Sequence, residues 1–117
     1  MVIRQGDIFW VELCDPTGSE PGYRHPHVVI QNNVFNMSKI NTVLLCALTS
    51  NLKRSLVPGN VTLLKGEANL PKKSVINISQ IITVNKHSLK EKIGTLSRKR
   101  INELYENIQI ILKPAEI

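Results

Sequence analysis

Two short polar stretches of this sequence carry the side chains best suited to chemistry. The run GSEPGYRHPHVVIQN, residues 18–32, contains Arg24 and His25 shortly before it becomes apolar. The run TSNLKR, residues 49–54, follows a second apolar stretch and adds hydroxyl, amide and basic groups. If the two runs meet in the fold, they surround one point with cations and hydrogen-bond donors, a combination that suits a phosphodiester. The alternative is that Arg24 and His25 are ordinary exposed loop residues.

A phosphodiester of RNA needs no metal for cleavage, because its own 2′-OH attacks the neighbouring phosphorus. The protein must then supply a proton acceptor, a proton donor and hydrogen-bond donors to the phosphorane oxygens. Histidine titrates near neutrality and transfers protons, whereas arginine offers a fork of donors to phosphate. A metal site is less favoured: His25 and His27 share one face of a strand, but no third ligand follows at a recognisable spacing.

The composition predicts one globular domain, residues 1–117, with an excess of positive charge. Apolar residues make up 42% of the chain, enough for a core. Fifteen Lys and Arg against nine Asp and Glu give a net charge of +6, which favours a polyanionic or acidic partner, with plain solubility as the alternative. Cys14 and Cys46 form no CxxC motif, so we expect reduced, buried thiols. No signal peptide or membrane-spanning run is recognisable, and we expect a cytoplasmic protein.

The elements that must position these groups are mostly strands. Alternating or continuous apolar runs predict strands at residues 7–13, 27–31, 42–48, 60–64 and 74–84. The last of these runs is either one long strand or two strands joined by a bulge near Ser79 and Gln80.

The end of the chain predicts helical structure. Ser88 and Glu91 match a capping box, which predicts a short helical turn ending near Gly94. From Ser97 onward, apolar residues recur every three or four positions and predict an amphipathic helix, which Pro114 ends. The expected fold is therefore mainly β: a five- or six-stranded antiparallel barrel or curled sheet closed by a C-terminal helix.

Several short motifs follow one another along the whole chain. They are Arg4-Gln5-Gly6-Asp7, Asp15-Pro16, Gly18-Ser19-Glu20, Pro26 before an apolar strand, Ala47-Leu48-Thr49, and Gln80 within SVINISQIITV. Gly-Ser-Glu alone is a weak signal, but the ordered set resembles the MazF/PemK family of bacterial toxins. The resemblance implies an SH3-like barrel, a homodimer and no cofactor. It also implies a sequence-specific endoribonuclease that cleaves single-stranded RNA to a 2′,3′-cyclic phosphate and a 5′-OH.

The same resemblance suggests which residues catalyse this reaction. The family pairs an arginine directly before a proline with a threonine that ends the next strand, and the threonine matches Thr49. The arginine does not match, because His25 precedes Pro26 and Arg24 lies one step earlier. We expect Arg24 to be the essential cation, since the phosphorane requires a permanent charge, and His25 to share in proton transfer. Alternatively, His25 has taken the arginine's place and Arg24 binds phosphate from the side.

Other polar residues are candidates for substrate binding, although turn capping or a solvated surface is an alternative for each. They are Ser19, Glu20, Gln31, Ser50, Asn51, Lys53, Arg54 and Gln80. We expect Phe9, Trp10 and Phe35 to lie in the core rather than to stack on bases. As a partner, the resemblance implies a small antitoxin whose acidic tail docks on the basic surface.

Two alternatives to catalysis stay open. One toxin of the same fold acts by binding a protein, DNA gyrase, through a C-terminal tail that bears Trp. This chain ends ILKPAEI and carries its single Trp at position 10, which disfavours that mode. The other alternative is an RNA-binding relative that lost activity when histidine replaced the arginine before Pro26.

Overall fold

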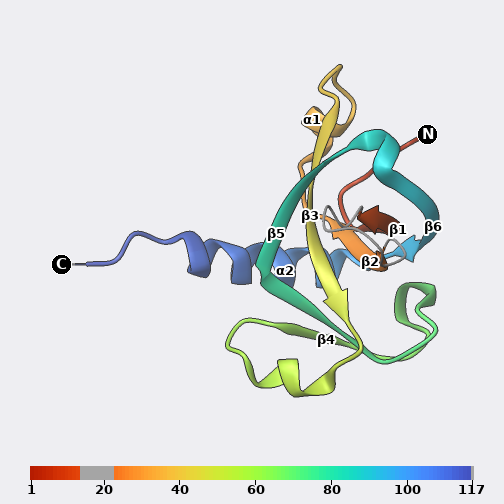
Figure 1. Cartoon of the computed structure of the whole chain (residues 1–117). Helices are drawn as coiled ribbons and strands as arrows, with labels where there is room; N and C mark the ends of the chain where they lie inside the picture. Colours follow the sequence, from red (N-terminus) through yellow and green to blue (C-terminus); the bar gives the residue numbers. More distant parts are fainter. Residues whose placement is uncertain (14–22, 117) are drawn as a thin grey trace.

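The computed structural model describes residues 1–13 and 23–116, which form one curled sheet and a C-terminal helix (Figure 1). Six antiparallel strands in the described part follow the order β4-β5-β3-β2-β1-β6. The edge strands β4 and β6 do not pair with each other, so the sheet is a half-barrel. The expected mainly β fold with a C-terminal helix is therefore confirmed.

The elements have the following bounds. The strands are β1 (Asp7–Leu13), β2 (Tyr23–Val29), β3 (Thr42–Thr49), β4 (Val61–Leu63), β5 (Ser74–Asn85) and β6 (Leu89–Thr95). The helices are α1 (Asn33–Asn36) and α2 (Arg98–Leu112), with 3₁₀ turns η1 (Leu52–Leu56), η2 (Glu67–Asn69) and η3 (Lys86–Ser88). None of the helices in the described residues is long and apolar enough to cross a membrane.

Strand alternation produces a separate apolar cluster on each face of the sheet. One cluster holds Phe9, Val11, Val29, Val43, Leu45 and Leu89. The other holds Ile8, Val28, Cys46, Leu48, Ile76 and Ile78, and α2 covers it through Ile101, Leu104 and Ile108. The predicted helix is thus confirmed: its N-cap is Ser97, and it ends one residue before Lys113, which the following proline keeps out of the helical region.

Strand β2 begins four residues before the predicted start at His27. It pairs with β1 from Tyr23 to Val28, but with β3 only from His27 to Val29. The apolar run therefore marks the part of β2 that has a strand on both sides. Pro26 lies in the one-sided part, where a strand tolerates the loss of an amide hydrogen.

Strand β5 contains the predicted bulge. Cys46 pairs with Ile81 and Ala47 pairs with Asn77, so residues 78–80 have no partner on β3. The side chain of Asn60 accepts a hydrogen bond of 3.1 Å from the amide of Ile78, one of the groups that the bulge frees. A polar side chain thus satisfies a backbone donor that the ladder cannot.

The helical turn predicted for residues 88–94 is wrong. Leu89–Thr95 form β6, which pairs with the outer edge of β1 from Asp7–Thr95 to Val11–Leu89. Leu89 is buried in this arrangement, whereas Glu91 is exposed and lies 3.7 Å from Arg24. The need of β1 for a second neighbour outweighs the local capping signal, which is worth only about 1 kcal/mol.

The three aromatic residues expected in the core behave differently. Phe9 is buried, as predicted. Phe35, which lies in the short helix α1, is 55% exposed, so it is not a core residue. Trp10 is only half-buried and lies on β1 opposite Pro26.

A buried carboxylate joins β1 to β6 and to the N-terminal segment. Asp7 is 1% exposed and accepts hydrogen bonds from the Thr95 hydroxyl (2.7 Å) and the Arg4 amide (3.0 Å). The ammonium of Lys92 lies 3.2 Å away. Three groups from two separate segments thus depend on one side chain.

Asp7→Ala should lower the free energy of unfolding by about 1–3 kcal/mol, because it leaves the partners of a buried carboxylate without an acceptor. Urea unfolding followed by circular dichroism measures the change. Glu12→Ala, which removes an exposed carboxylate from the same strand, should change stability by less than about 0.5 kcal/mol. Equal unfolding midpoints for the two variants would contradict this role of Asp7.

Candidate functional site

Strands β2 and β3 separate at the level where the chemistry-bearing residues lie. Their ladder ends at the pair His27–Ala47, after which β3 stays with β5 and β2 stays with β1. If the register continued by two residues, His25 would lie opposite Thr49. Pro26 has no amide hydrogen to donate across this gap.

The gap holds a pocket of about 230 Å³ with three walls. Strands β1 and β2 provide Trp10, Arg24, His25 and Pro26, the end of β3 provides Leu48, Thr49 and Ser50, and the segment before β5 provides Leu70, Pro71, Lys72 and Ser74. The lining residues include two cations and an imidazole but no carboxylate. Such a pocket favours an anion.

Arg24 is held only weakly by its protein neighbours. Its guanidinium lies 3.7 Å from Glu91, and the two side chains are 48% and 79% exposed. An exposed ion pair at this distance contributes little. The guanidinium therefore keeps most of its hydrogen-bonding capacity for a ligand.

The hydroxyl of Thr49 has a defined orientation. Its oxygen accepts a hydrogen bond of 3.1 Å from the Asn51 amide, which leaves its own hydrogen available for donation. Asn51 in turn caps η1, because its side chain accepts a bond of 3.2 Å from the amide of Lys53. The short turn after β3 thus fixes the orientation of the Thr49 hydroxyl.

Four of the predicted site residues line this pocket: Arg24, His25, Thr49 and Ser50. Asn51, Lys53 and Arg54 follow them on the exposed turn η1, next to the pocket but not in its lining. Ser19 and Glu20 lie outside the described residues.

Gln31 and Gln80 are not brought to the pocket. Gln31 follows the opposite end of β2, is 8% exposed, and donates to the Asn36 side chain (3.0 Å) and the Thr42 carbonyl (3.2 Å). These bonds give it a structural role in the loop around α1. Gln80 lies exposed in the β5 bulge.

Trp10 and Lys72 also line the pocket, although no sequence motif marks either as a site residue. Trp10 reaches it because β1 pairs with β2 and sets Trp10 opposite Pro26. The alternation in β1 was a usable signal, since Trp10 lies on the face opposite Phe9. Lys72 reaches the pocket only through the path of residues 64–73, for which the sequence carries no comparable pattern.

Cys46 does not add a nucleophile. It is fully buried, and burial raises the pKa of its thiol to about 12, so the thiol stays protonated at neutral pH. The expectation of a buried, reduced thiol is confirmed for Cys46, while Cys14 lies outside the described residues. Among residues 1–13 and 23–116, no three His, Cys, Asp or Glu side chains gather into a metal-binding group.

A family model describing the "PemK-like, MazF-like toxin of type II toxin-antitoxin system" matches residues 4–112. The chain belongs to this family. Endoribonuclease MazF6 of Mycobacterium tuberculosis is 36% identical over 112 residues, covering 96% of this chain and 98% of the relative. Endoribonuclease MazF of Staphylococcus saprophyticus is 37% identical over 111 residues, covering 95% and 92%.

Solved structures of similar fold belong to the same group of proteins. A MazE-MazF crystal structure from Deinococcus radiodurans has a TM-score of 0.80 at 20% identity and covers 98% of this chain and 99% of that chain. A mycobacterial endoribonuclease in complex with its cognate antitoxin has a TM-score of 0.76 at 20% identity, covering 97% and 99%. At these identities the structures support the fold, and the sequence matches carry the family.

In this PemK/MazF-like chain, a second histidine, His27, follows His25 by two residues on β2 and has a structural role. His27 is 2% exposed, and its Nδ1 lies 3.0 Å from the carbonyl oxygen of His25. Burial lowers the pKa of His27, and the charge of His25 adds to this, although the bond to the His25 carbonyl opposes it. The ring is therefore uncharged at neutral pH and supports the strand that carries Arg24 and His25.

Acid should destabilise the protein through His27. In the unfolded chain this residue takes up a proton below pH 6.5, whereas the folded protein resists protonation because its pKa is lower. The unfolded state thus binds more protons, and stability falls as pH drops below 6.5. His27→Gln should lose less stability between pH 8 and pH 5 than the wild type, as urea midpoints measure. Parallel pH profiles of the two proteins would contradict this assignment, and the difference at pH 8 gives the packing cost alone.

Proposed function

We propose that this chain is a sequence-specific, metal-independent endoribonuclease toxin that cleaves single-stranded RNA in the pocket between β2 and β3. The observation that carries the proposal is the set of groups lining that pocket: Arg24, His25 and the oriented hydroxyl of Thr49, without a carboxylate. The names of its relatives, endoribonucleases of toxin–antitoxin systems, agree with this chemistry.

The reaction follows from what each group can do. A base removes the proton of the RNA 2′-OH, whose oxygen attacks phosphorus, and the bond to the 5′-oxygen breaks as that oxygen takes up a proton. His25 exchanges these protons, since an imidazole carries one nitrogen that accepts a proton and one that donates it. Arg24 and the Thr49 hydroxyl donate to the phosphorane oxygens. The products are a 2′,3′-cyclic phosphate and a 5′-OH.

An alternative division of roles rests on the strand register. Continued pairing of β2 with β3 would set His25, not Arg24, opposite Thr49. In that arrangement His25 contacts the scissile phosphate together with Thr49. Arg24 then binds a neighbouring phosphate from the other face of β2.

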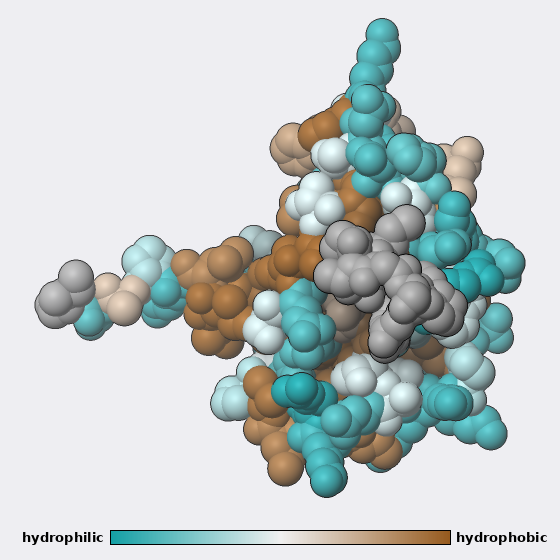
Figure 2. Space-filling view, viewed as in Figure 1, coloured by the Kyte–Doolittle hydropathy of each residue, from teal (hydrophilic) through white to brown (hydrophobic). Residues whose placement is uncertain are grey.

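We propose two protein partners for this toxin in the bacterial cytoplasm. The first is an acidic antitoxin whose tail covers the basic pocket, in keeping with the net charge of +6. The second is another copy of the chain. Figure 2 shows apolar side chains along the half of α2 that projects from the sheet, where Ile110 and Leu112 are 71% and 68% exposed. If two copies paired symmetrically through this half of α2, the apolar side chains of both copies would be buried between them.

Purified protein incubated with a mixed-sequence RNA in EDTA should cleave it at a defined motif. The products should carry 5′-OH ends that a kinase phosphorylates directly, and 3′ ends that resist phosphatase until acid opens the cyclic phosphate. Thr49→Ala should lower the single-turnover rate about a hundredfold or more, because it removes a preorganised donor. Thr49→Ser, which keeps the hydroxyl, should retain most of the rate.

Several outcomes would overturn this function. Loss of cleavage in EDTA, or products with 5′-phosphates, would exclude the proposed mechanism. Tight RNA binding without cleavage would instead indicate an inactive relative. Growth arrest by Thr49→Ala at matched expression would favour a toxin that acts by binding a protein.

Arg24→Ala and Arg24→Lys should both lose most of the single-turnover cleavage rate at saturating RNA. The lysine variant loses it as well because an ammonium does not reproduce the forked donors of a guanidinium. His25→Ala should keep partial activity with a changed pH profile between pH 5 and 9, since the side chain that exchanges protons is removed. The reverse ranking, with His25→Ala inactive and Arg24→Ala weakened only in RNA binding, would assign the arginine's place to His25. Near-wild-type cleavage by Arg24→Ala excludes Arg24 as the essential cation.

A further inference from the structure

The third wall of the pocket carries a cation that neither the sequence motifs nor the proposed chemistry uses. Lys72 lies in the segment between β4 and β5 and lines the same pocket as the β2 residues Arg24 and His25. Within residues 1–13 and 23–116, no carboxylate forms an ion pair with Lys72. Its ammonium is therefore available to an anion that enters the pocket.

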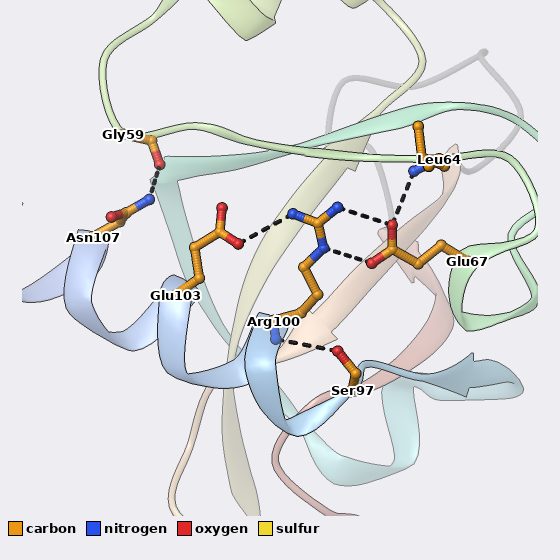
Figure 3. A network of polar contacts seen from close by, with 7 residues as sticks. All are labelled: Gly59, Leu64, Glu67, Ser97, Arg100, Glu103 and Asn107. Carbon is orange, nitrogen blue, oxygen red and sulfur yellow. Dashed lines mark hydrogen bonds and ion pairs between the residues drawn. The ribbon is translucent and has the colours of Figure 1, made fainter.

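The segment that leads to Lys72 is clamped by helix α2 (Figure 3). Arg100 binds Glu67 with two bonds, Nε to Oε2 at 2.6 Å and Nη2 to Oε1 at 3.1 Å. Glu67 also accepts a bond of 3.1 Å from the Leu64 amide, and Arg100 is itself held by Glu103 at 3.1 Å. A bidentate pair of this kind fixes geometry as well as distance.

The loop around η2 has an unusual backbone conformation, and contacts with neighbouring elements stabilise it. Ala68 and Asn69 have φ values of 49° and 60°, in the left-handed region, which asparagine adopts readily but alanine avoids. The Asn69 side chain donates to the Ile93 carbonyl of β6 at 3.0 Å. A methyl group at Gly94 would overlap the carbonyl oxygen of Ala68, so the loop packs directly on the β6 backbone. Contacts with α2 and β6 thus impose the conformation.

This conformation is transmitted to Lys72 over a few residues. The Leu70 amide donates to the Glu67 carbonyl at 3.0 Å, and the Leu70 side chain is buried. The ring of Pro71 fixes the φ angle of the residue before Lys72. The Ser74 hydroxyl donates a hydrogen bond of 2.9 Å to the Lys72 carbonyl. The backbone of Lys72 is therefore held on both sides, and its side chain starts from a fixed point on the pocket wall.

We propose that Lys72 is a further substrate-binding residue, whose ammonium contacts an RNA phosphate next to the scissile one, and that Arg100, through Glu67, is a positioning residue for it. This inference rests on the proposed cleavage of RNA. A strand of RNA that places one phosphate beside Arg24 and Thr49 must continue past one of the pocket walls. Lys72 offers a positive charge on a wall that β2 does not form, whereas the apolar Leu48 and Leu70 offer none.

The adjacent lysine supplies a matched control. Lys73 is exposed and has the same charge, but it does not line the pocket. The probe is the RNA oligonucleotide that the wild type cleaves, with the 2′-OH at the cleaved position replaced by hydrogen. Fluorescence anisotropy at several salt concentrations measures its binding, and the unmodified oligonucleotide measures single-turnover cleavage.

Lys72→Ala should weaken binding about fivefold or more at low salt and reduce the salt slope by about 0.7, the value for one lost phosphate contact on a single strand. Lys73→Ala should change both values by much less. At subsaturating RNA the cleavage rate of Lys72→Ala should fall together with its affinity, and a higher RNA concentration should recover much of the loss, as expected of a binding residue rather than a catalytic one.

Arg100→Ala should also weaken binding, but not further in a Lys72→Ala background, because it acts through that residue. Arg98→Ala removes the same charge from an exposed position of the same helix and should have little effect. The exchange Glu67→Arg with Arg100→Glu should restore part of the affinity by rebuilding the pair. Thermal unfolding of each variant confirms that it is folded under assay conditions.

The outcomes separate this inference from the function on which it rests. If the wild type cleaves RNA but Lys72→Ala and Lys73→Ala bind alike, Lys72 is not a phosphate contact and the proposed function stands. If Arg100→Ala weakens binding equally with and without Lys72, the positioning role fails. If the wild type neither binds nor cleaves RNA, the proposed function fails and this inference fails with it.

Discussion

The end of the β2–β3 ladder at His27–Ala47 is the constraint on which the rest of the structure depends. A ladder propagates only where each strand supplies its donors, and Pro26 has none to offer. At the same level β5 bulges, because Cys46 pairs with Ile81 and the next residue pairs with Asn77. Strand β3 follows β5 and leaves β2 there. The opening that results has polar side chains on both of its edges.

An opening in a sheet persists only if its backbone groups and walls are supported from elsewhere. Asn60 satisfies the Ile78 amide at the bulge, and Asn51 fixes the hydroxyl of Thr49. The third wall depends on the Arg100–Glu67 pair and on close packing against Gly94. Helix α2 therefore has two roles: it covers the apolar cluster, and through Arg100 it holds the loop at Glu67 that leads to the pocket.

The sequence predicts most accurately those elements whose pattern reflects burial along their whole length. The strand at residues 7–13 alternates between two buried faces, and the helix after Ser97 has one continuous apolar stripe, so both predictions match the structure. The predicted helical turn that ends near Gly94 is wrong because the sequence shows only the local capping motif. The free edge of β1, with which these residues pair, is a tertiary feature.

The same distinction explains the candidate site. Arg24, His25, Thr49 and Ser50 adjoin strand ends, so a reading of the sequence finds them. Lys72 depends on a loop clamped by a residue 28 positions later in the chain, which no local pattern reveals. Gln31 has the residue type of a binding group, but its amide is used within the α1 loop.

The geometry of an opening also accounts for the unusual order of arginine and histidine before Pro26. On the face of a continuous sheet, neighbouring residues point to opposite sides, and only one of them reaches a given site. The pocket of this protein lies instead at the free edge of β2, where β3 has departed. Side chains from both faces of the strand reach around that edge, and both Arg24 and His25 line the pocket. A cation displaced by one residue along the chain is thus still presented to the same space, which a site on a sheet face would not allow.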